Sequence, residues 1–98
     1  MGTVIVSEQD IINAVCLFMS HEKKVEPDEV EVELIYDDEA DMMFSAEAYV
    51  NGHQHVLPTA KIIGALRLWI NLYLEMDAIS AGIQLDFNET DGIIATVR

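Results

Sequence analysis

Basic side chains are scarce in this sequence. Its 98 residues include 5 lysines and arginines against 18 aspartates and glutamates, which gives a formal net charge of −13. A charge of this sign repels phosphate backbones and anionic lipid surfaces, and it attracts cations and basic proteins. We therefore expect no nucleic acid and no membrane as a partner, and we consider a basic protein partner instead.

Cysteine and long apolar runs are scarce as well. Cys16 is the sole cysteine, so no disulfide can form within the chain, which suits a reducing compartment. The first six residues lack the basic region and the apolar core of a secretion signal. The longest apolar segment, 62–76, contains Arg67 and Glu75, and it is too short and too polar to span a bilayer. We expect a cytoplasmic protein.

Catalytic signatures are missing too. The sequence contains no glycine-rich phosphate loop, no G-x-S-x-G and no C-x-x-C. Cys16 lacks a base, because His21 lies five residues on, at a helical angle well away from it. Glu31 and Glu33 have matching surroundings, whereas acid–base catalysis needs two carboxyls in different environments. These observations favour a protein without enzymatic activity.

Apolar residues, by contrast, make up 51% of the chain. A chain of this length and composition is expected to fold as one domain, here residues 1–98. Apolar side chains at the helical period predict a helix over Glu8–Lys23, with Ser7 as its N-cap. A second helix is predicted over residues 60–76, capped by Thr59, with an apolar arc of more than half its circumference.

Alternating apolar and polar residues predict the strands. They lie at Val30–Tyr36, 43–50, 53–57, Ile83–Asn88 and 93–97. Asn-Gly at positions 51 and 52 is a strong hairpin signal, because a type I′ turn needs positive φ at both central residues. Such a turn predicts that Val50 pairs with His53, Ala48 with His55 and Ala46 with Leu57. The predicted fold is an α+β two-layer sandwich, with a five-stranded antiparallel sheet and two helices on one face. Its element order is α-β-β-β-α-β-β.

One pattern suggests a metal site. His53 and His55 are two residues apart on a predicted strand, so both imidazoles project from the same face, a spacing that occurs in metal sites. Glu31 and Glu33 on a neighbouring strand are the candidate further ligands. The alternative hypothesis is therefore a divalent-metal-binding protein or a metal-dependent hydrolase. The competing interpretation is that both histidines lie beside the turn without a metal, because two ligands do not make a site; we then expect no cofactor.

The second helix has more apolar surface than one sheet face can cover. Leu68, Leu72 and Met76 flank its apolar stripe, and burying one such side chain is worth about 1.5–3 kcal/mol. A self-complementary patch of this kind can hold two copies together around a two-fold axis. We therefore expect a homodimer, and a non-enzymatic interaction module is the favoured function.

Three blocks of the sequence carry a family resemblance: DIINAVC at 10–16, VEVELIYDD at 30–38 and FSAEAYVNG at 44–52. Together they resemble the YxcD-like family of small uncharacterised proteins from bacilli and their relatives. The resemblance implies a bacterial cytoplasmic protein that stands alone as a domain, and it implies no functional residues.

Overall fold

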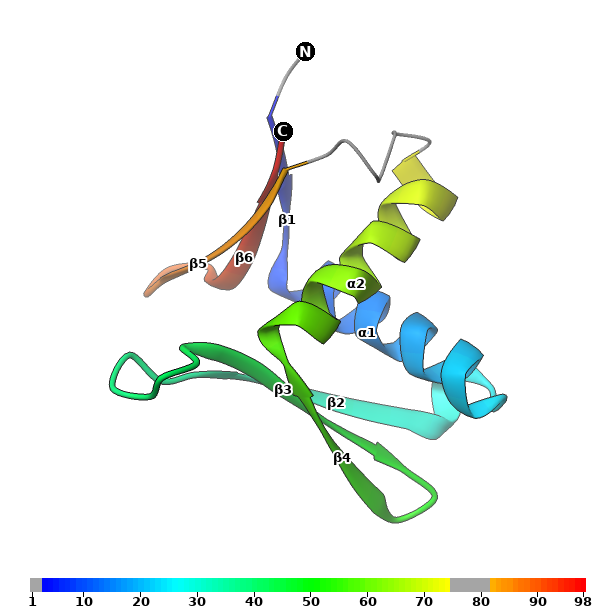
Figure 1. The fold of residues 1–98 in the computed structure, drawn as a ribbon. Coiled ribbons are helices and arrows are strands. Elements are labelled where there is room, and N and C mark those ends of the chain that lie inside the picture. Colours follow the sequence, from blue (N-terminus) through cyan, green and yellow to red (C-terminus); the bar gives the residue numbers. More distant parts are fainter. Residues whose placement is uncertain (1–2, 75–81) are drawn as a thin grey trace.

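The computed structural model describes residues 3–74 and 82–98. This part of the chain forms an α+β fold of two α-helices and six strands, in two three-stranded antiparallel sheets (Figure 1). The first sheet, in spatial order, contains β2 (Val30–Tyr36), β3 (Phe44–Val50) and β4 (His53–Pro58). The second contains β1 (Val4–Val6), β6 (Gly92–Val97) and β5 (Ile83–Asn88).

The predicted single five-stranded sheet is therefore wrong. Strand β1 was not predicted, because its three residues are too few to show an alternating pattern. In the structure, β1 pairs with β6, with Val4 opposite Val97 and Val6 opposite Ala95. Because β5 occupies the other edge of β6, this hairpin forms its own sheet with the start of the chain.

The first helix and the Asn-Gly hairpin are confirmed. Helix α1 spans Glu8–Lys23, and the Ser7 hydroxyl accepts a hydrogen bond of 3.2 Å from the Asp10 backbone N–H. Asn51 and Gly52 have φ angles of 51° and 81°. The register that this turn predicts is also found, with the residue pairs Val50–His53, Ala48–His55 and Ala46–Leu57.

The second helix differs from its prediction at both ends. Helix α2 spans Thr59–Trp69, and its N-cap residue is Pro58. Thr59 is therefore inside the helix, and its hydroxyl donates a hydrogen bond to the Phe44 carbonyl oxygen on β3. After Trp69 the chain continues as a π-helical turn, η2 (Ile70–Leu74). The wider turn rotates later side chains away from the positions that a 3.6-residue period predicts.

Both helices lie on the same side of the β2–β3–β4 sheet, and α1 also contacts β6 of the second sheet (Figure 1). Ala46 and Ala48 of β3 are fully buried, and their small side chains leave room for the helices to approach the sheet. The side chains between these layers form one buried cluster. Its largest fully buried members are Val6, Ile11, Val15, Ile62, Leu66, Ile70 and Val97.

Besides the shared core, two side-chain contacts join the second sheet to the rest of the molecule. Phe87 of β5 stacks on Tyr36 of β2, with ring centroids 4.4 Å apart and planes 5° from parallel. The Glu8 carboxylate at the start of α1 accepts a hydrogen bond of 2.9 Å from the Ile93 backbone N–H. Gly92 leaves space for this carboxylate, because a Cβ there would lie 2.5 Å from a Glu8 oxygen. Its φ of 75° also favours glycine.

Candidate functional site

The structure places the histidine pair on β4. His53 and His55 lie opposite Val50 and Ala48 in the ladder, so they share the sheet face that the helices cover. His53 is exposed beside the turn, whereas His55 is half-buried. Glu31 and Glu33 instead lie opposite Tyr49 and Glu47 on β3, and successive strand residues point to opposite faces.

The structure therefore does not bring the four predicted ligands together. The two glutamates are on the uncovered face of the sheet, and the two histidines are on the helix-covered face. Within residues 3–74 and 82–98, no group of three or more His, Cys, Asp or Glu side chains could hold a metal ion.

On the uncovered face, the carboxylates surround Tyr49. The Tyr49 hydroxyl donates a hydrogen bond of 2.9 Å to Glu47. This hydrogen bond is the main cause that raises the pKa of Tyr49 above its usual range, and the negative charges of Glu47 and Glu33 act in the same direction. Removing the phenolic proton would add a further negative charge beside these two carboxylates, so Tyr49 acts as a hydrogen-bond donor on this face.

Cys16 lies on α1 beside the start of β2, half-buried and packed against the core. Its thiol sulfur is 3.7 Å from the Val30 carbonyl oxygen, and burial raises the pKa of the thiol above its ordinary value. A reactive cysteine needs the opposite shift, because the thiolate is the nucleophile. The side chain therefore contributes to packing in its protonated form.

An apolar groove lies next to Cys16, between α1 and the end of the second helix. Its volume is about 490 Å³, and its walls include Cys16 and Leu17 of α1, Trp69 of α2 and Tyr73 of η2. The rings of Trp69 and Tyr73 contact each other, with centroids 6.1 Å apart. At the far side, Pro27 and Asp28 of η1 (Pro27–Glu29) complete the apolar groove.

Two of the predicted interface residues, Leu68 and Leu72, lie on the helical segment that also provides Trp69 and Tyr73 to the groove. Leu72 is 50% exposed and Tyr73 is 62% exposed, whereas Leu68 is half-buried. Met76 lies outside the described residues. We use the name α2–η2 surface for the exposed side of these two elements, with Leu68, Leu72 and Tyr73. A regular 3.6-residue period would place Tyr73 within the apolar stripe of the second helix, and the π-helical turn explains its exposure.

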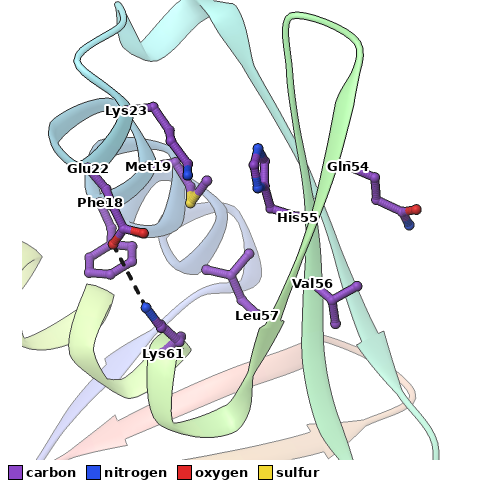
Figure 2. Close-up of a pocket in the computed structure, with 9 residues that line it drawn as sticks. All are labelled: Phe18, Met19, Glu22, Lys23, Gln54, His55, Val56, Leu57 and Lys61. Carbon is purple, nitrogen blue, oxygen red and sulfur yellow. Dashed lines mark ion pairs between the residues drawn. The ribbon is translucent and has the colours of Figure 1, made fainter.

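A second hollow lies at the other end of α2. Its volume is about 310 Å³, and it is bounded by the last turns of α1, by β4 and by the first turn of α2 (Figure 2). Figure 2 shows the His55 imidazole pointing across it toward Lys23 and Met19, while Gln54 and Val56 point to the other side of β4. We call this hollow the basic pocket. Its lining residues are Phe18, Met19, Glu22, Lys23, Gln54, His55, Val56, Leu57 and Lys61.

The charged groups of the basic pocket interact with one another. Lys61 lies 3.9 Å from the Glu22 carboxylate, with both side chains about half exposed, and it also lies 5.8 Å above the Phe18 ring. Two of the protein's five lysines and arginines, Lys23 and Lys61, thus line the same hollow as His55. Sequence reasoning missed this convergence, because the three residues come from different elements. The available signal was the placement of these lysines in the last turn of one helix and the first turn of the next.

Comparison with known proteins places the chain in a family. Residues 1–90 match the family model described as a protein of unknown function, DUF2653. The chain belongs to this family. It is also 28% identical to the uncharacterized protein YxcD of Bacillus subtilis (strain 168), over 96% of this chain and 91% of that protein. The resemblance predicted from the three sequence blocks is thus confirmed. No solved structure matches the chain.

Proposed function

We propose that this member of the family is a non-enzymatic, homodimeric interaction module whose subunits meet through the α2–η2 surface. The observation that carries the proposal is the pair of exposed apolar side chains at the end of the second helix, Leu72 and Tyr73, of which Tyr73 also lines the apolar groove. Water contact at such side chains is unfavourable, and their burial contributes about 25 cal/mol for each Å² of apolar area.

The charge distribution favours a second copy as the occupant. Residues 59–74 contain no aspartate or glutamate, whereas residues 26–41 contain nine. Two chains that each carry a charge of −13 repel each other most weakly when they meet through their least acidic surfaces. The α2–η2 surface is such a place, apart from Asp28 at the rim of the groove.

A two-fold arrangement uses both features at once. In such an interface each subunit presents the same patch to the other. Leu72 of one subunit can then enter the groove beside Trp69 and Tyr73 of its partner, and the reverse contact forms by symmetry. Each side-chain contact therefore occurs twice in the dimer.

The net charge and the single cysteine also bear on the partner and the cellular compartment of the protein. A strongly acidic protein attracts basic proteins and repels nucleic acid and anionic membranes, so a further partner would be basic. The lone, protonated Cys16 is in keeping with a reducing cytoplasm. The proposed role requires no cofactor. Among the described helices, none is long and apolar enough to cross a membrane.

The test compares two exposed apolar residues. Leu72→Glu places a charge on the α2–η2 surface, and Ile5→Glu places one at a 60% exposed position on β1. Sedimentation velocity at micromolar concentration should show dissociation for Leu72→Glu and a dimer for wild type and Ile5→Glu. Equal effects of the two variants would contradict an interface at α2–η2, and circular dichroism confirms that both are folded.

A further inference from the structure

We infer that the basic pocket binds a small organic phosphate, with the phosphate group between Lys23, His55 and Lys61 and the organic part on the apolar wall. This inference goes beyond the dimer proposal, because the basic pocket lies at the opposite end of α2 from the α2–η2 surface.

The first support is the local charge. Lys23 and Lys61 bring two positive charges to one hollow of a protein whose net charge is −13. The imidazole of His55 faces the same space (Figure 2). A phosphate offers three acceptor oxygens, and lysine ammonium groups are strong donors to them. This concentration of hydrogen-bond donors does not suit a metal cation.

The second support is that the existing ion pair is weak. Lys61 is 51% exposed and Glu22 is 40% exposed, at an N–O distance of 3.9 Å. Exposed pairs of this kind contribute little stability. Lys61 can therefore turn from Glu22 to an incoming anion at little cost, and Glu22 then becomes the one group lining the basic pocket that opposes the ligand.

The third support is the shape and the apolar wall. Met19 and Leu57 are almost fully buried at the base of the pocket, and Phe18 forms one side (Figure 2). The volume of about 310 Å³ is at the small end of ligand sites, which span roughly 300–1,000 Å³. A nucleic acid strand would extend beyond this hollow onto the acidic surface, so the geometry favours one small phosphate with an apolar group.

The experiment is an NMR titration of the ¹⁵N-labelled protein with phenyl phosphate, inorganic phosphate and phenol at constant ionic strength. We expect shifts at the lining residues, with phenyl phosphate bound more tightly than inorganic phosphate and no binding of phenol. Equal affinity for the two phosphates, binding of phenol alone, or shifts spread over the whole surface would each overturn the proposal.

Matched variants distinguish the pocket from general charge effects. Lys61→Gln should weaken the binding of phenyl phosphate about tenfold, which is the loss expected for one charge-assisted hydrogen bond. Lys24→Gln removes the same charge outside the pocket and should change affinity by less than about twofold. Glu22→Gln should strengthen binding, and Glu89→Gln should not. Equal losses in the two lysine variants, or equal gains in the two glutamate variants, would contradict the assignment.

Discussion

The two hollows at the ends of α2 are built from different chemistry. The apolar groove at the η2 end is walled by Leu17 of α1, Trp69 of α2 and Tyr73 of η2, and residues 59–74 of α2 and η2 contain no aspartate or glutamate. The basic pocket at the other end places Lys23 and Lys61 around an apolar base. One hollow has an exposed apolar rim and suits another protein surface. The other has converging charges and suits a small anion. A single helix can thus serve two binding surfaces, because each end meets different neighbours.

The largest expected change in the dissociation constant of the dimer comes from placing two negative charges on the α2–η2 surface. Leu68→Glu with Leu72→Glu removes apolar contacts that occur twice in a two-fold dimer. With about 1.5–3 kcal/mol for each buried side chain, the dissociation constant should rise at least about a hundredfold. Sedimentation equilibrium measures this change. Because Leu68 is half-buried, Leu72→Glu alone serves as the variant that leaves the core untouched, and an unchanged constant in both would argue against this interface.

A smaller, several-fold change in the dissociation constant of the dimer is expected from salt. Two copies with a charge of −13 each repel, and salt shortens the range of this repulsion from about 10 Å at 0.1 M to about 3 Å at 1 M. The apolar contact is not weakened by screening. The dimer should therefore become tighter between 0.05 and 0.5 M NaCl, as measured by sedimentation velocity. Weaker association at high salt would indicate an interface held by ion pairs.

Cys16 provides a third test, because it lines the apolar groove. Burial raises the pKa of its thiol, so over the pH range between the ordinary and the raised value the folded protein contains less thiolate than the unfolded chain. Stability linked to this group is fully present below the ordinary pKa and is lost as the pH rises through the folded pKa. Iodoacetamide should label Cys16 with a higher pH midpoint in the folded protein than in urea, as followed by mass spectrometry. A lower midpoint in the folded protein would indicate an activated cysteine.

The smallest effect is expected from replacing the histidine pair, which should leave the response of the melting temperature to Zn²⁺ unchanged. Glu31 and Glu33 lie on the opposite sheet face from His53 and His55, so Zn²⁺ meets two imidazoles without the predicted carboxylates. We expect any Zn²⁺-dependent rise in melting temperature to be the same in wild type and in His53→Ala/His55→Ala. A rise that the double variant abolishes would restore the metal hypothesis.

Local signals in the sequence predicted part of this fold. Asn51-Gly52 predicted the register of β3 and β4, because its turn type admits one pairing, and Ser7 predicted the start of α1. The three-residue strand β1 was missed, because its pairing with β6 depends on residues some 90 positions away. The change from α-helix to a π-helical turn at Ile70 was also not predicted, because the spacing of apolar residues around Ile70 does not indicate it.

The candidate sites divide in the same way, into features that one element determines and features that depend on how several elements are placed. Exposure of Leu72 beside an apolar stripe was predictable from helical spacing, since it concerns one element. The groove wall at Tyr73 and the meeting of Lys23, His55 and Lys61 were not predictable, because they need the relative placement of α1, β4 and α2. The predicted metal ligands lie on two faces of the sheet for a related reason: strand spacing indicates which residues share a face only within one strand, and the register between strands decides the rest.

The measurement that tests the central claim most directly is sedimentation equilibrium of the wild-type protein over about 1–100 μM, a range in which moderate protein–protein affinities are seen. We expect a mass twice that of the 11.0 kDa chain for the wild-type protein, and the mass of a single chain for Leu72→Glu. A wild-type protein that stays at 11.0 kDa throughout would contradict the dimer.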